Sequence, residues 1–283
     1  MDINQFYRFN DENEKPLDNI VTDGGFTAIF RSIACVGDSL SSGELESQTE
    51  DGTVGWHDYY EHSWGQYIAR AIGSKVHNFS CGGMRAAWYN ESFADEKDFW
   101  NPELASQAYI YALGVNDVNA CRCIHGGKDL DDFKRLLGNV DTDVDFNDWR
   151  NNKDTFIGHY ARIVQRYQEI SPKARMFLMT MPRQAGMEEL YDKAYDYHAE
   201  LLRELASKLE FTYVIDLRKY APVYDHTVYD NFFMGGHMST MGYLFTAHIV
   251  MSYIDFIIRH NVDDFRQTGF IGKGGVHNCR FKW

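Results

Sequence analysis

Five short runs with β-strand character, either apolar or alternating, are separated by longer segments with helical periodicity, and this pattern constrains the fold of the 283-residue chain more than any other feature. Runs of this length, most of them ending at or beside a glycine or a proline, are typical of buried β-strands. They are Ser32–Gly37, Lys75–Ser80, Gln107–Leu113, Ala174–Met181 and Phe211–Leu217. Strands that alternate with helices predict a parallel sheet that is covered by helices on both faces.

The segments between these runs carry apolar residues at intervals of three and four, which predicts helices. The clearest is Thr155–Ile170, which is followed by Pro172, and similar periods cover Trp64–Ile72, Leu190–Leu209 and Thr240–His260. We therefore predict a three-layer α/β/α fold with a flavodoxin-like, mostly parallel five-stranded sheet.

No internal repeat and no linker interrupts this pattern, so residues 1–283 are predicted to form one domain. Its core is predicted at about residues 32–260, with an N-terminal extension at 1–31 and a C-terminal tail at 261–283. The stretch 121–152 is polar, acidic and weakly patterned, which predicts a long loop with a functional or lid role.

Charge and composition exclude several classes of partner. The chain has 28 Lys and Arg against 41 Asp and Glu, a net charge of −13, and no basic cluster, which excludes nucleic acid as an expected partner. We see no signal peptide and no stretch that approaches the roughly 20 apolar residues of a membrane span, so no membrane partner is expected. Five scattered cysteines favour reduced thiols and a cytoplasmic location. The oligomeric state stays open and includes a homo-oligomer.

Short polar or glycine-rich segments follow three of the predicted strands, and a fourth precedes the last predicted helix. They are Gly37–Leu40, Asn78–Gly83, Gly114–Asp117 and Gly235–Ser239. Each alone resembles an ordinary turn. In open parallel sheets, however, ligands bind beyond the carboxyl ends of the strands, so together these segments predict a functional site.

These four segments resemble those of the SGNH (GDSL) hydrolases, a superfamily of esterases and lipases, over the span from Ser32 to about Ile258. The resemblance implies that Ser39, in Gly-Asp-Ser-Leu, is the nucleophile and that His237 is the base. It also implies that Gly83 and Asn116 supply the oxyanion hole, which binds the negative oxygen formed during attack.

The chemistry of ester cleavage suits these residue types. The backbone N–H groups of Ser39 and Gly83 and the side-chain amide of Asn116 can donate hydrogen bonds to the developing oxyanion. His237 Nε2 would take the serine proton and return it to the leaving alcohol. We expect Gly83 to let the backbone approach the substrate because it has no Cβ. The mechanism requires no cofactor.

One position departs from the family pattern. Members usually carry Asp three residues before the histidine, where this chain has Met234. Asp230 could loop back to His237, a main-chain carbonyl could accept from its Nδ1, or a distant carboxylate could substitute. We expect a Ser39–His237 dyad oriented by a main-chain carbonyl, with Asp230 as the next choice.

Other residue types in these segments have structural interpretations. Asp38 and Asp117 are expected to hold their loops as turn and cap residues. Ser41 and Ser42 are expected to be caps or to line the pocket. A single Cys-x-Cys pair near residue 121 has too few ligands for structural zinc, so no metal site is predicted.

The resemblance and the composition together predict a carboxylic ester hydrolase that acts through a Ser39 acyl-enzyme. Short acyl groups, especially acetate, on a carbohydrate are the expected substrate, a small-molecule or glycan ester. The aromatic stretch Trp56–Trp64 should overhang the site, either as core or as a sugar-stacking or acyl-pocket wall. A lipase or lysophospholipase is the alternative, and Met234 makes a weak or inactive sugar-binding protein the alternative of another class.

Overall fold

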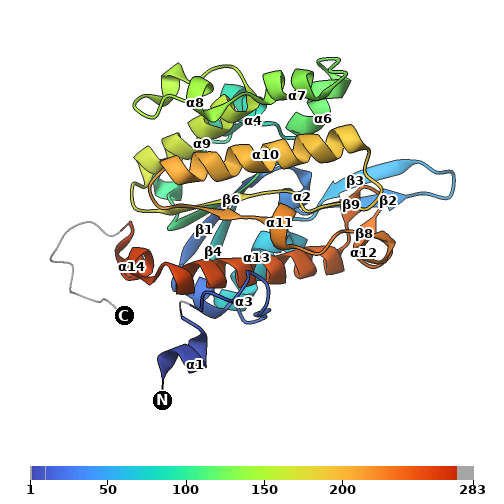
Figure 1. Cartoon of the computed structure of the whole chain (residues 1–283). Coiled ribbons are helices and arrows are strands. Elements are labelled where there is room, and N and C mark those ends of the chain that lie inside the picture. The colour runs from blue at the N-terminus through green and yellow to red at the C-terminus, as the bar shows by residue number, and fades with distance from the viewer. Residues whose placement is uncertain (1, 10, 273–283) are drawn as a thin grey trace.

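The central sheet has five parallel strands in the order β4-β1-β5-β6-β7, in a computed structural model that describes residues 2–9 and 11–272 (Figure 1). The strands are β1 (Ser32–Gly37), β4 (Lys75–Ser80), β5 (Ala108–Ala112), β6 (Arg175–Met179) and β7 (Thr212–Ile215). The predicted flavodoxin-like sheet is confirmed, because these strands, numbered along the chain, have the order 2-1-3-4-5. The end of the predicted C-terminal tail, 273–283, lies outside the described residues.

Helices cover both faces of this sheet, as predicted. In Figure 1, α9 and α10 lie above the sheet, and α3 and α13 lie below it. These helices are α3 (Trp64–Ile72), α9 (Phe156–Ile170), α10 (Glu189–Lys208) and α13 (Thr240–His260). Alternation along β5 divides the core: Tyr109 and Tyr111 pack on the side of α9 and α10, and Ile110 packs on the side of α3 and α13.

Helix α13 corrects one expectation about membranes. Within residues 2–9 and 11–272, it is the one helix that is long and apolar enough to cross a bilayer, which the sequence analysis did not recognise. Most of it is buried, and its apolar residues pack with those of α3 beneath the sheet. That burial is typical of a core helix in a globular domain.

The stretch 121–152 is not the long loop that the sequence predicted. Helix α6 (Val115–Cys123) is followed by α7 (Leu130–Leu137), α8 (Val140–Asp143) and the short 3₁₀ helix η5 (Trp149–Asn151). Asp129, Asn139 and Asp148 begin these three helices, because each side chain accepts a backbone N–H of the first turn. Three of the polar residues that weakened the apolar pattern are therefore helix caps. The short helices pack on α9 and α10.

Two hairpins, each a separate two-stranded sheet, lie beside the predicted site. The first, β2 (Glu44–Gln48) with β3 (Val54–Asp58), follows α2 (Ser39–Ser42) and projects from the body at the right of Figure 1. The second, β8 (Phe233–Met234) with β9 (His237–Met238), lies beside β2. The remaining α-helices are α1 (Ile3–Tyr7), α4 (Ala86–Trp88), α5 (Ala94–Glu96), α11 (Leu217–Tyr220), α12 (His226–Phe232) and α14 (Val262–Phe265).

Candidate active site

The four predicted site residues gather at the carboxyl edge of the sheet. Ser39 begins α2 directly after β1, Gly83 lies in the turn after β4, and Asn116 lies in the first turn of α6 after β5. These strands are neighbours, and the strand order reverses at β1, where open parallel sheets bind ligands. His237 comes from β9, which packs against both α2 and β2.

A buried carboxyl group holds the turn that carries Ser39. Asp38 is the N-cap of α2, and its Oδ1 accepts the Leu40 N–H at 3.0 Å. Burial, together with the nearby carboxyl groups of Asp117 and Glu44, raises the pKa of Asp38 to about 7. Asp38 thus has the structural role that the sequence predicted.

The three serines of this turn have different environments. Ser42 donates its hydroxyl to Asp58 Oδ1 at 2.8 Å and so ties α2 to β3. Ser41 is buried beneath Gly37, where an added Cβ would lie 2.5 Å from the Ser41 Cβ. The Ser39 hydroxyl makes no hydrogen bond to any residue that the structure describes, and Ser39, at 8% exposure, is the most accessible of the three residues.

Asn116 connects the serine turn with the glycine turn. Its Nδ2 donates to the Met84 carbonyl at 3.2 Å and to Asp38 Oδ2 at 3.4 Å. Gly83 has a φ of +70°, which favours glycine, and open space where a Cβ would lie. Its backbone conformation, rather than a crowded Cβ position, therefore requires glycine.

Glu46, which the sequence analysis missed, is the partner of His237. Glu46 Oε2 lies 3.1 Å from His237 Nδ1 and accepts the Gly236 N–H at 2.9 Å. A Cβ on Gly235 would lie 2.0 Å from Glu46 Oε1, so the glycine before Gly236 leaves room for the carboxylate. The hydrogen bond with His237 lowers the pKa of Glu46, which keeps that carboxylate ionised at neutral pH.

A second glutamate of β2 contacts the other ring nitrogen of His237. Glu44 Oε1 lies 3.0 Å from Nε2, and Glu44 Oε2 would lie 2.5 Å from a Cβ on Gly82, so this carboxyl group sits between the histidine and the glycine turn. Burial raises the pKa of Glu44, although His237 opposes the shift. Tyr243 of α13 fixes the start of β2 by donating its hydroxyl to the Glu44 carbonyl at 2.6 Å.

The expected dyad with a main-chain carbonyl is therefore wrong, and so is Asp230 as the second choice. Asp230 is exposed on α12, and Met234 is 47% exposed. The third arrangement that the sequence left open, a distant carboxylate, is the one observed, since His237 comes 191 residues after Glu46. Its sequence signals were the alternating glutamates after the serine turn and the two glycines before His237.

The aromatic stretch after the serine turn divides between core and surface. Trp64 is fully buried at the start of α3, so it fills the core. Trp56, on β3, and Tyr59, just after it, are exposed.

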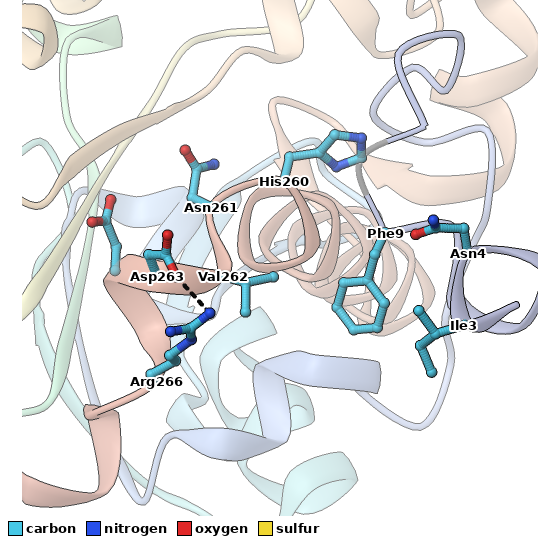
Figure 2. A pocket seen from close by; sticks show the side chains of 9 residues that line it. Ile3, Asn4, Phe9, His260, Asn261, Val262, Asp263 and Arg266 are labelled. Carbon is cyan, nitrogen blue, oxygen red and sulfur yellow. Dashed lines mark ion pairs between the residues drawn. The ribbon is translucent and has the colours of Figure 1, made fainter.

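Two hollows differ in their relation to this site. One, of about 290 Å³, is lined by the residues on either side of Ser39 and of His237 and by apolar side chains such as Met179, Leu217 and Phe233. The other, of about 580 Å³, lies at the far end of α13 and is lined by residues that include Phe9, His260 and Arg266 (Figure 2). Helix α13 has 21 residues, a length of about 30 Å, and His237 precedes its first turn, so the second hollow is remote from the site.

The Cys-x-Cys pair lies at the end of α6, where Cys121 is buried and Cys123 is exposed. In the part of the chain that the structure describes, no group of three or more His, Cys, Asp or Glu side chains is arranged to hold a metal ion. Cys279 lies outside that part.

Asp117 provides a pH-dependent prediction. It is buried, accepts the Ala86 N–H at 3.1 Å, and has a pKa that burial raises from 3.8 to about 7. Between these two pKa values the folded state therefore binds more protons than the unfolded state. The contribution of Asp117 to the free energy of unfolding thus falls as the pH rises from about 4 to about 7. Asp117→Asn keeps an acceptor but does not titrate. In thermal unfolding, we expect the decrease in Tm between pH 4 and pH 7 to be about 5 °C smaller for Asp117→Asn than for the wild type.

The exposed Asp131→Asn is the control for this experiment, and it should follow the wild type at every pH. Parallel Tm curves for wild type and Asp117→Asn would contradict the raised pKa of Asp117.

The sequence and the fold were both compared with known proteins. The model of the GDSL-like lipase/acylhydrolase family matches residues 35–244. No curated protein matches the sequence of this chain.

Solved structures with a similar fold include carbohydrate esterases. A family two carbohydrate esterase from Clostridium thermocellum, in complex with cellohexaose, is 14% identical with a TM-score of 0.51 and covers 89% of this chain and 66% of its own. A carbohydrate esterase family 2 enzyme from Corynascus thermopiles (Myceliophthora fergusii) is 15% identical with a TM-score of 0.52 and covers 81% and 66%. A carbohydrate acetylesterase from Sinorhizobium meliloti is 14% identical with a TM-score of 0.51 and covers 80% and 99%. At these low sequence identities, the similarity to the three structures shows that the fold is shared.

Proposed function

The chain belongs to the GDSL-like lipase/acylhydrolase family and is a carboxylic ester hydrolase, and from this premise we propose that it cleaves acyl esters of carbohydrates through a Ser39 acyl-enzyme. The observation that carries the mechanism is the 3.1 Å contact between His237 Nδ1 and Glu46 Oε2. An ionised carboxylate at Nδ1 fixes the tautomer in which Nε2 accepts a proton, and it stabilises the imidazolium that forms. Glu46 is thus a positioning residue that replaces the family's aspartate.

The proposed reaction has two steps that use the same base. Ser39 Oγ attacks the ester carbonyl carbon while its proton moves to His237 Nε2, and the proton then passes to the alcohol as the carbon–oxygen bond breaks. Water then attacks the acyl carbon while one of its protons moves to Nε2, and this proton passes to Ser39 Oγ as the bond between the acyl carbon and Oγ breaks, which releases the acid and restores Ser39 and His237. Because Glu44 holds Nε2 in the structure, its carboxyl group must give up that contact when substrate binds.

The oxyanion hole follows from the strand ends. The Gly83 turn and the Ser39 turn flank Asn116, whose amide reaches both of them. We assign the backbone N–H groups of Ser39 and Gly83 and the Nδ2 of Asn116 as donors to the oxygen that becomes negative. An oxyanion would replace the 3.4 Å contact between Nδ2 and Asp38.

Two observations support a neutral carbohydrate ester as the substrate. The similar solved structures named above are carbohydrate esterases, one of them an acetylesterase, which favours acetyl groups on sugars. The carboxyl groups of Asp38, Glu44, Glu46 and Asp58 also gather at the site, so an anionic alcohol would be repelled. The carboxylate beside His237 removes the argument for an inactive sugar-binding protein.

A second candidate, an esterase for longer acyl chains, is favoured by the apolar cavity of about 290 Å³. The cavity adjoins both Ser39 and His237 through their chain neighbours, and it exceeds what an acetyl group fills. The test of function must therefore also report the length of the acyl group.

Labelling with alkyl fluorophosphonates tests both candidates, since these reagents react with activated serines. We expect one label per chain, mapped by peptide mass spectrometry to Ser39, and no label in Ser39→Ala. A methyl reagent that labels faster than an octyl reagent would support an acetyl esterase, and the reverse order would support the second candidate. Label on Ser41 or Ser42 would refute the assigned nucleophile.

A further inference from the structure

The register of the β2–β3 hairpin places Trp56 beside the residues that hold His237. In this antiparallel pair Glu46 is opposite Trp56, and Glu44 is opposite Asp58. Residues that are directly opposite project from the same face, with Cβ atoms about 5 Å apart. The face that carries Glu44 and Glu46, which contact both ring nitrogens of His237, therefore also carries Trp56.

Trp56 is not part of the hydrophobic core. Its side chain is 61% exposed, on a hairpin that projects from the body (Figure 1), whereas Trp64, eight residues later, is buried. The opposite face of the hairpin carries Ser47 and His57, whose side chains hydrogen-bond at 2.8 Å. The Tyr59 ring lies next to the His57 ring, with the ring centroids 6.1 Å apart and the planes tilted. The two faces thus offer a matched pair of exposed aromatic residues, of which one shares a face with the carboxylates at His237.

The reaction itself fixes which part of the substrate meets this face. His237 Nε2 returns its proton to the leaving alcohol, so the alcohol oxygen must lie next to Nε2, where Glu44 lies in the structure. The group attached to that oxygen then extends over the Glu44, Glu46 and Trp56 face of the hairpin. The apolar cavity adjoins the serine turn and does not include any of these three residues.

We propose that this face of the β2–β3 hairpin is the subsite for the sugar ring of the leaving alcohol, an inference that rests on the proposed function. The apolar C–H face of a neutral pyranose ring packs on the indole of Trp56, and the carboxylate of Glu44, released from Nε2, accepts a hydrogen bond from a sugar hydroxyl. Three carboxyl groups on one face, with Asp58 the third, exclude anionic sugars.

The test compares two acetate esters that differ in the alcohol alone, an acetylated methyl glucoside and ethyl acetate. We expect Trp56→Ala to raise KM for the glucoside about tenfold and to leave kcat within about twofold, because the lost contact is with the bound ring rather than the reacting atoms. For ethyl acetate both constants should stay unchanged. Trp56→Phe should restore most of the affinity.

Tyr59→Ala is the matched control, because it removes an exposed aromatic ring from the opposite face of the same hairpin. Tyr59→Ala should leave kcat and KM unchanged for both esters. Equal effects of Trp56→Ala on both esters, or no effect on the glucoside, would overturn the subsite while leaving the esterase intact. If the wild type hydrolyses neither ester, the proposed function fails, and the subsite fails with it.

Discussion

Replacing Glu46 with glutamine is expected to lower kcat by about a thousandfold to ten-thousandfold, with little change in KM. Glutamine keeps an oxygen for the Gly236 N–H, so the turn before His237 can persist. In that orientation the same oxygen also faces Nδ1, but the neutral amide carries no negative charge to stabilise the imidazolium. In the flipped orientation the NH2 group takes the place of this oxygen, loses the Gly236 contact and donates to Nδ1, which fixes the tautomer whose Nε2 carries the proton. The comparable Asp→Asn change in a serine protease triad costs about 10⁴ in kcat. Steady-state hydrolysis of p-nitrophenyl acetate measures this effect.

Asp230→Asn is the matched control, because it makes the same chemical change at the carboxylate that the sequence favoured next. Asp230 is exposed on α12, so we expect its kcat to stay within about twofold of the wild type. Glu46→Asp should recover part of the activity that Glu46→Gln loses, because it restores a carboxylate beside Nδ1. Full kcat in Glu46→Gln together with a large loss in Asp230→Asn would reverse the assignment.

The layers of the fold could be predicted because burial leaves a local signature. The inner strands β1, β5 and β6 are buried on both faces and so appear as apolar runs, and α9 and α13 carry caps at Thr155 and Ser239 that mark where they begin. The β2–β3 hairpin carries no such signature. Neither of its strands is buried, and one of its faces serves His237 rather than the core, so no alternation of apolar and polar residues marked it.

The same distinction between local and distant contacts explains the site. Ser39, Gly83 and Asn116 each follow a strand, so the topology of a parallel sheet was enough to bring them together. The partner of His237 depends on how one hairpin packs against another, which no periodicity encodes. Gly235 was a local sign of that contact, because the Glu46 carboxylate occupies the space where a Cβ on Gly235 would lie.

Substitution of Asn116 tests whether its amide, which lies between the Ser39 turn and the Gly83 turn, stabilises the transition state. In the structure its Nδ2 donates at 3.2 Å to the Met84 carbonyl and at 3.4 Å to Asp38. The longer contact is near the limit of a hydrogen bond, and it involves a carboxyl group whose raised pKa leaves it only partly ionised at neutral pH. A full negative charge on the substrate oxygen is a better acceptor, so the amide gains most when the oxyanion forms.

Asn116→Ala is therefore expected to lower kcat by about a hundredfold to a thousandfold and to change KM by less than about threefold. Asn119→Ala removes an amide from the exposed side of the same helix and should leave both constants unchanged. Thermal unfolding separates this effect from a disrupted turn, since a correctly folded Asn116→Ala should keep a Tm within a few degrees of the wild type. A rise in KM at constant kcat would mean that Asn116 binds the ground state, and the oxyanion charge would then rest on the Ser39 and Gly83 backbone N–H groups alone.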